Sequence, residues 1–134
     1  MGEGMMRFSG WRTLEGRYPD RDDRESRRFG WQTASLGYSF WRSSVYRNAM
    51  TITVCATGLR LRPNRALLPL ARSVFIPWTA LSPKISILLV MREWDLHIAE
   101  TAGLRLSLRA ALATRLDDAS GGKLGLKTVT QPPN

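Results

Sequence analysis

Chemically reactive side chains are scarce in this sequence of 134 residues. Cys55 is the single cysteine and His97 the single histidine. One cysteine excludes an intrachain disulfide, a zinc ribbon and a CxxC redox pair, and it suits a reducing compartment. One histidine leaves little for acid–base catalysis or metal binding near neutral pH. We therefore expect a protein that is not an enzyme and that carries no metal and no cofactor.

Long hydrophobic runs are also missing. The longest, ISILLVM at residues 85–91, is far shorter than the roughly 20 residues of a membrane-spanning helix. At the N-terminus no basic flank is followed by an apolar stretch, and Met6 stands where a myristoylation motif requires Ser or Thr. These absences predict a cytoplasmic protein without a transmembrane segment, whose charge still allows a peripheral position at a membrane.

Negative charge is absent from half of the chain. Residues 26–92 contain ten basic residues and none of the 11 acidic ones, and the formal net charge of the protein is +9. A positive field over such a stretch attracts polyanions, whether phospholipid headgroups, nucleic acid or an acidic protein. An alternative is a coding bias towards arginine, because 17 of the 20 basic residues are Arg. Both explanations remain open at this point.

Short segments rich in β-branched and aromatic residues, separated by turn residues, predict a mainly β fold of the α+β class with antiparallel strands. Alternation supports this assignment, since Met50, Ile52 and Val54 share one face of a strand and Leu59 and Leu61 share one face of the next. The seven expected strands are residues 33–41, 46–55, 58–63, 74–78, 84–91, 94–99 and 103–107.

Two helices are expected to flank the strands. Ser9 is a candidate N-cap for a short N-terminal helix with Trp11, Leu14 and Tyr18 on one side. An amphipathic C-terminal helix is expected from about Ser107 to Ala119, with Ser107 as its N-cap and a stop before Gly121. Residues 1–30 then form a short helix and a polar loop, residues 31–120 form the β domain with its helix, and residues 121–134 form a flexible tail.

The tetrapeptide Gly-Leu-Arg-Leu occurs twice, beginning at Gly58 and at Gly103. Each copy is expected to begin the second arm of a hairpin, with the glycine at positive φ and the two leucines in the core. Alternation then turns Arg60 and Arg105 outward. We interpret the repeat as structural, and we expect a binding role only for the first copy, because Arg105 lies in the charge-balanced end of the chain.

Seven antiparallel strands followed by one C-terminal helix is the element order of the pleckstrin-homology-like (PH-like) fold. The run TGLRLRPNRALLPLARSVFIPWTALSP also resembles small uncharacterised bacterial proteins of PH-like (PH/GRAM-like) type, in which a Gly-Leu-x-Leu strand leads into an Ile-Pro-Trp element, here Ile76, Pro77 and Trp78. The resemblance covers roughly residues 33–119. It implies a PH-like barrel or sandwich that binds phosphoinositides, peptides or partner proteins.

Two basic segments are candidate binding sites. The expected first hairpin loop, RSSVYRN, places Arg42 and Arg47 beside two serine hydroxyls that would contact a phosphate. The segment RPNRALLPLARSVFIPW joins arginines to apolar residues, so it either packs across an open sheet edge or offers a docking surface. Together with Arg60, these segments supply the six candidate partner-binding residues: Arg42, Arg47, Arg60, Arg62, Arg65 and Arg72.

His97, Cys55 and the aromatic residues are further candidates for metal binding, catalysis or nucleic-acid binding, and each also has a simpler structural explanation. His97 lies in a row with Glu93 and Asp95, which would suit a metal or an acid–base group, but a solvated strand face is the simpler interpretation. We expect Cys55 to be packed and inert, because no activating group is evident. Exposed aromatics among arginines would suit single-stranded nucleic acid, with Trp41, Phe75 and Trp78 as candidates. Most of the five tryptophans are nevertheless expected in the core.

These observations predict a non-catalytic binding module. Its partner is expected to be an acidic protein surface or anionic membrane headgroups, recognised through the basic central region. The alternative is RNA or single-stranded nucleic acid. Nothing in the sequence indicates an oligomeric state.

Overall fold

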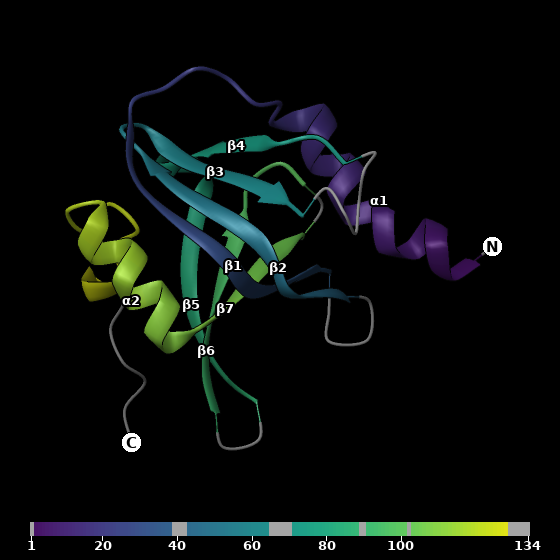
Figure 1. The fold of residues 1–134 in the computed structure, drawn as a ribbon. Helices are drawn as coiled ribbons and strands as arrows, with labels where there is room; N and C mark the ends of the chain where they lie inside the picture. The colour runs from purple at the N-terminus through teal and green to yellow at the C-terminus, as the bar shows by residue number, and fades with distance from the viewer. Residues whose placement is uncertain (1, 39–42, 65–70, 89–90, 102, 129–134) are drawn as a thin grey trace.

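A computed structural model describes residues 2–38, 43–64, 71–88, 91–101 and 103–128 (Figure 1). Seven antiparallel strands form one sheet, and the helices α1 (Gly2–Arg17) and α2 (Ala110–Ala119) precede and follow it in the sequence. The prediction of a mainly antiparallel β protein with one N-terminal and one C-terminal helix is therefore confirmed. The strands are β1 (Glu25–Gly37), β2 (Ser43–Cys55), β3 (Gly58–Pro63), β4 (Val74–Pro77), β5 (Leu81–Leu88), β6 (Met91–Ile98) and β7 (Arg105–Arg109).

The strand order across the sheet is β4-β3-β2-β1-β7-β6-β5. The long strand β1 joins the two halves, because it pairs with β2 along most of its length and with β7 through residues 34–37. Register shifts interrupt β1 between Phe29 and Gln32 and between Gln32 and Ala34. Such irregularities bend a strand, which lets β1 belong to both halves of a curled sheet. The edges of the sheet are β4 and β5, linked by the short 3-10 turn η1 (Trp78–Ala80).

The concave face of the sheet holds the hydrophobic core. On β2 the alternating residues Met50, Ile52 and Val54 are buried, and Leu59 and Leu61 of β3 lie beside them in register. Leucines of β6 and β7 complete the core from the other half of the sheet. Alternation therefore predicted the buried face of these strands correctly. Within the described residues, no helix is long and apolar enough to cross a bilayer.

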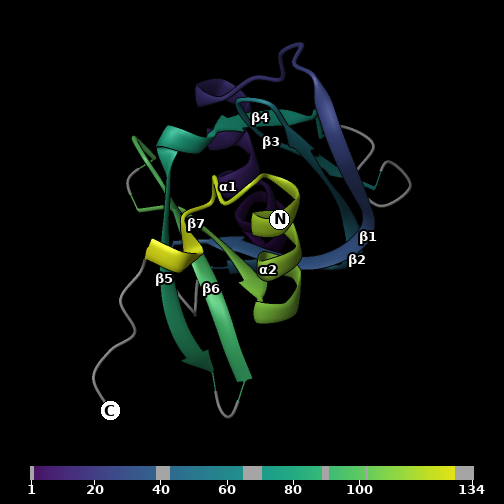
Figure 2. The ribbon, with the colours of Figure 1, turned by 90° about the vertical axis from the view of Figure 1, so that its left-hand side faces the viewer.

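Two helices lie at opposite ends of the curled sheet (Figure 2). From α1, Trp11 and Leu14 are fully buried, and the Trp11 Nε1–H group donates a hydrogen bond to the Arg72 carbonyl at 2.9 Å. From α2, Leu112 and Leu116 are buried against the other end. Each helix thus covers apolar side chains that the curled sheet alone would leave open to water.

The helix boundaries differ from the sequence prediction. α1 runs from Gly2 to Arg17, so Ser9 lies inside the helix and is not its N-cap, although Trp11 and Leu14 are buried as expected. Ser107 does not cap α2 either, because it belongs to β7 and its hydroxyl donates to Asp95 Oδ1 at 2.7 Å. β7 pairs with β1 on one side and with β6 on the other, and its pairing with β6 continues to Arg109. The helix α2 therefore begins only at Ala110.

The start of the β domain also lies earlier than predicted. Residues 25–30, expected in a polar loop, form the first part of β1. Their charged side chains face solvent, while Phe29 faces the core. The prediction of a loop is wrong because a strand with one solvent-exposed face can be as rich in charged residues as a loop. The remaining strands were predicted to within about four residues, and β3 has the bounds that were expected.

The segment after α2 packs more closely than the prediction of a flexible tail allowed. Leu124 and Leu126 are buried in the core, and Leu126–Thr128 form the 3-10 turn η2. Gly121 adopts a φ of 73° where α2 ends, as a C-terminal glycine commonly does. The prediction of a mobile tail therefore stands untested only for residues 129–134, which lie outside the described residues.

The two glycines of the repeated tetrapeptide are required for different reasons. Gly103 has a φ of 94°, as predicted for a hairpin turn. Gly58 does not have positive φ, so that part of the prediction is wrong. A Cβ atom on Gly58 would instead lie 2.3 Å from the Ile76 carbonyl oxygen, because β4 crosses very close to β3 at this point.

Alanine substitutions test this difference. Gly58→Ala is expected to lower the free energy of unfolding by about 1–3 kcal/mol, since a backbone atom must move. Gly103→Ala is expected to cost about 1–2 kcal/mol through its left-handed conformation alone. Gly30→Ala, where no atom lies within 4 Å of an added Cβ, is the control and should change stability by less than about 0.5 kcal/mol. Equal urea unfolding curves for Gly58→Ala and Gly30→Ala would contradict the close approach.

Candidate functional site

The six candidate arginines do not form one cluster. Arg42 and Arg65 lie outside the described residues. Arg47 is exposed on β2, and Arg72 is exposed at the end of the sheet covered by α1, where its backbone N–H donates to Glu15 Oε2 at 2.6 Å. Only Arg60 and Arg62 share one strand and one face, the outer face of β3. The outer face of β1, β2 and β3 is therefore the place to look for a site.

A groove runs along this outer face with β2 as its floor. Thr51 and Thr53 lie on the floor, and each is paired in register with an arginine of β3, Arg62 and Arg60 respectively. On the other side, Arg28 of β1 is paired with Thr53. Two adjoining hollows of about 280 Å³ and 460 Å³ make up the groove, and both are lined by Trp31, Thr51 and Arg62.

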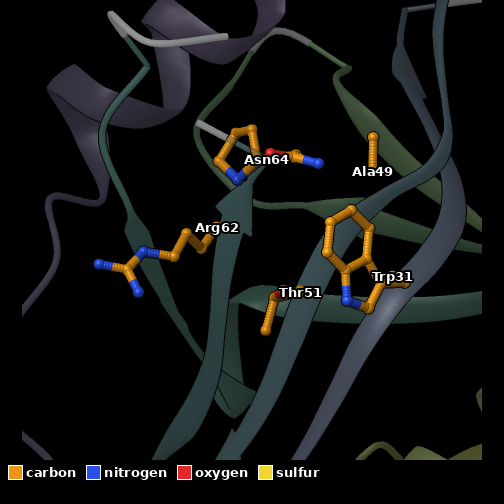
Figure 3. Close-up of a pocket in the computed structure, with 6 residues that line it drawn as sticks. Trp31, Ala49, Thr51, Arg62 and Asn64 are labelled. Carbon is orange, nitrogen blue, oxygen red and sulfur yellow. The ribbon is translucent and has the colours of Figure 1, made fainter. Parts of the chain in front are cut away.

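The smaller hollow is shown in Figure 3. Trp31 stands on one side, Arg62 on the other, and Thr51 lies between them, while Ala49 and Asn64 bound the hollow at its far end. The Asn64 backbone N–H donates to the Ala49 carbonyl at 2.7 Å, which fixes this end. The hollow thus combines one aromatic ring, one cation and several polar groups on three adjacent strands.

Trp31 lines both hollows but was not among the predicted site residues. It is 69% exposed and has a φ of 56°, which is rare for a residue other than glycine. Holding a non-glycine residue in this conformation costs about 1–3 kcal/mol and is found disproportionately at functional sites. In an unbroken strand Trp31 would share the inward face of Phe29, two residues earlier, and the bulge between Phe29 and Gln32 prevents this.

The other aromatics follow the prediction that most tryptophans belong to the core. Trp11 is buried, and Trp78 and Trp94 pack against the core with part of their surface exposed. Phe75 is buried beneath the Arg21 guanidinium, 4.5 Å from its ring centre. Phe75 and Trp78 are therefore not exposed platforms for bases, and Trp41 lies outside the described residues.

Residues 18–24 form a strap that joins α1 to β1 (Figure 1), and Asp20 and Asp22 of this strap line one end of the groove. Arg60 donates to Asp20 Oδ1 and to the Arg21 carbonyl, at 2.8 Å in each case, and forms an ion pair with Glu25. Only 16% of the Arg60 side chain is exposed. Partial burial opposes its charge, but the hydrogen bond to Asp20 and the negative charges nearby, Asp20 foremost, together outweigh burial and raise the pKa of Arg60. Arg60 therefore serves as the anchor of the strap.

Thr57, in the turn between β2 and β3, makes the second attachment of the strap. Its backbone N–H and its hydroxyl both donate to Asp23 Oδ2 at 2.7 Å. These two hydrogen bonds lower the pKa of Asp23 from its ordinary value. The strap is therefore held by carboxylates of both Asp20 and Asp23.

Arg62 lies two residues beyond Arg60 on the same face and differs from it. Its side chain is exposed, and the guanidinium forms no hydrogen bond or ion pair with any residue that the structure describes. At its opposite, strap end the larger hollow is lined by Asp20, Asp22 and Glu25 and also by Arg28 and Arg60, which form ion pairs with these carboxylates. Among the described residues, the unpaired cation of the groove is thus Arg62, at the end with Trp31.

The remaining candidates, Asp95, His97 and Cys55, are not among the described residues that line the groove. Asp95 is buried rather than solvated as predicted, because Lys84 and Ser107 flank it on the neighbouring strands. Partial burial, with a smaller contribution from Lys84, lowers the pKa of His97. Cys55 is buried as expected, and burial raises the pKa of its thiol. Among the described side chains, no three His, Cys, Asp or Glu residues are placed to share a metal ion.

Replacing the anchor of the strap should affect stability. Arg60→Gln is expected to lower the free energy of unfolding by about 1–2 kcal/mol, because charge-assisted hydrogen bonds are lost to partly exposed carboxylates. Arg62→Gln removes the same charge two residues away and should change stability by less than about 0.5 kcal/mol. Urea denaturation measures both, and equal losses would show that Arg60 does not anchor the strap.

The attachment through Asp23 predicts a pH dependence. Because folding lowers the pKa of this carboxyl, its contribution to stability is present above the unfolded pKa of about 3.9 and is lost as the pH falls through the folded pKa. The amide resonance of Thr57, followed by NMR, should shift with a midpoint below about 3.9. Asp23→Asn should abolish that titration and Asp22→Asn should preserve it; a midpoint at or above the unfolded value would contradict the assignment.

Comparison with known proteins assigns no family to this chain. No protein-family model matches the sequence. No match is found among curated proteins either. The function of the groove therefore has to follow from its geometry and chemistry.

Proposed function

We propose that this chain is a non-catalytic binding module of PH-like architecture. Two features support the PH-like assignment: seven antiparallel strands in which each strand except β1 and β7 pairs only with neighbours in sequence, and a C-terminal helix over one end of the sheet. The resemblance of the run through Ile76, Pro77 and Trp78 agrees with this assignment. The scaffold leaves the interior filled by core side chains, so its ligand binds outside.

The ligand of this module is anionic, an acidic protein surface or anionic headgroups. The observation that carries this proposal is the contrast between Arg60, which the strap already neutralises, and Arg62, which is exposed and has no counter-ion among the described residues. The carboxylates of the strap against Arg60 also illustrate how an acidic segment lies on this face. A partner with carboxylate or phosphate groups would pair with Arg62 as the carboxylates of the strap pair with Arg60.

One further feature favours headgroups as a source of the negative charge. Val45 is 61% exposed on β2, two residues from the exposed Arg47. An exposed apolar side chain beside a cation is the combination that peripheral proteins place at a membrane surface. Single-stranded nucleic acid is the second candidate, and the observation that favours it is the exposed indole of Trp31 beside Arg62.

A salt-titrated binding panel tests this proposal. The probes are polyglutamate, vesicles containing phosphatidylserine, neutral vesicles and a single-stranded oligonucleotide. We expect binding to at least one anionic probe, weakening as salt rises, and no binding to neutral vesicles. Arg62→Gln should weaken the binding about fivefold, the effect of about 1 kcal/mol per basic residue, while Arg109→Gln on β7 should have little effect. Absence of binding to every anionic probe at low salt would overturn the proposal.

A further inference from the structure

We infer that the hollow between Trp31 and Arg62 binds one nucleotide unit of a single-stranded nucleic acid, with its base stacked on the indole and its phosphate at the guanidinium. The inference rests on the anion binding proposed for this groove, and it develops the second candidate ligand, single-stranded nucleic acid, at one defined hollow. It follows from the backbone at Trp31, the polarity of the hollow and the spacing of its two sides.

The backbone at Trp31 displays the indole instead of burying it. Its φ of 56° and the register shift after Phe29 turn outward a side chain that strand alternation would place in the core. A large aromatic ring that is 69% exposed forfeits the burial that normally makes tryptophan stabilising. The backbone of Trp31 is strained and its indole is left exposed to solvent. This combination is expected where a ligand covers the ring.

The lining of the hollow suits a planar group with polar edges. Beside Trp31, the apolar residues that line the hollow within the described part of the chain are Ala49 and Pro63, while Thr51, Asn64 and Arg62 are polar or charged. Its volume of about 280 Å³ is near the lower end of the roughly 300–1,000 Å³ of small-molecule sites, enough for one ring system. An aliphatic side chain of a protein partner would gain little in such a polar hollow, whereas a nucleobase presents a π-face to the indole and hydrogen-bonding edges to the floor.

The two sides of the hollow match the two parts of a nucleotide. Trp31 on β1 and Arg62 on β3 are separated by the single strand β2, so their backbones lie about 10 Å apart, two strand spacings. Figure 3 shows Thr51 between them and the Arg62 side chain extended away from Trp31. A base on the β1 side therefore leaves its phosphate to be reached from the β3 side. Arginine binds phosphate oxygens in this way without reading sequence.

The surroundings limit the ligand to a short single strand. Base pairs of a duplex hide the π-faces of their bases, so only an unstacked base can lie on the indole. At the strap end of the larger hollow, Arg28 and Arg60 are paired with Glu25 and Asp20, and Asp22 adds a further carboxylate, so this end offers a phosphate no unpaired cation among the described residues. The strand thus passes over Trp31 and Arg62 and leaves the groove away from the strap. An acidic protein segment would satisfy Arg62 but leave Trp31 uncovered.

The experiment separates stacking from charge. Binding of oligo(U) and oligo(dT) is compared with binding of linear polyphosphate of equal charge, which has no bases. The wild-type protein should bind the oligonucleotides more tightly than polyphosphate. Trp31→Ala should weaken oligonucleotide binding about tenfold and leave polyphosphate binding unchanged, whereas Trp31→Phe, which keeps an aromatic face, should retain most of the affinity. Arg62→Gln should weaken the binding of both polymers.

The outcomes distinguish this inference from the proposed function. If polyphosphate, polyglutamate or anionic vesicles bind through Arg62 but oligonucleotides bind no better and Trp31→Ala has no effect, the nucleotide inference is wrong and the anion-binding proposal stands. If no anionic probe binds, both fail. Because Trp31 is exposed, Trp31→Ala should keep the wild-type unfolding midpoint, and a variant that keeps this midpoint but loses oligonucleotide affinity selectively supports the stacking site.

Discussion

The incomplete closure of the curled sheet is the constraint on which the rest of the structure depends. A sheet that bends round a core without joining its edges exposes apolar side chains at both ends. Trp11 of α1 fills one end and donates its indole N–H to a backbone carbonyl, so that burial leaves no donor unpaired. Leu112 and Leu116 of α2 fill the other end. With both ends covered and the interior packed, the groove lined by Trp31, Thr51 and Arg62 lies on the outer surface of the sheet.

The outer surface of β1, β2 and β3 has one end that the strap covers and one end that the strap leaves exposed. The strap lies over one half, where Asp20 and Glu25 neutralise Arg60. Arg62 lies on the same strand and face but beyond the reach of the strap, so its charge remains available. The acidic residues up to Glu25 and the acid-free stretch that follows them therefore meet on this surface, where the carboxylates neutralise Arg60 and leave Arg62 exposed.

Most of the fold could be predicted from local patterns. Period-two alternation predicted the buried faces of β2, β3, β6 and β7, because one face of each strand contacts the core and the other contacts water or polar neighbours. The predictions failed where two patterns competed. Charged residues on the wet face of β1 resembled a loop, and Ser107 resembled an N-cap although it lies in a strand with partners on both sides. Gly58 was assigned correctly to a hairpin but for the wrong reason, since space and not φ requires it.

The sequence by itself determined the fold class, the core faces, the position of the C-terminal helix and the surplus of positive charge, because each depends on residues near one another in the chain. Only the tertiary structure decided which arginine is free and which tryptophan faces outward. Arg60 is neutralised by residues 40 and 35 positions away, and no local pattern distinguishes it from Arg62. Trp31 faces water because pairing with β2 forces a bulge into β1, and a single inserted residue reverses the face that alternation assigns.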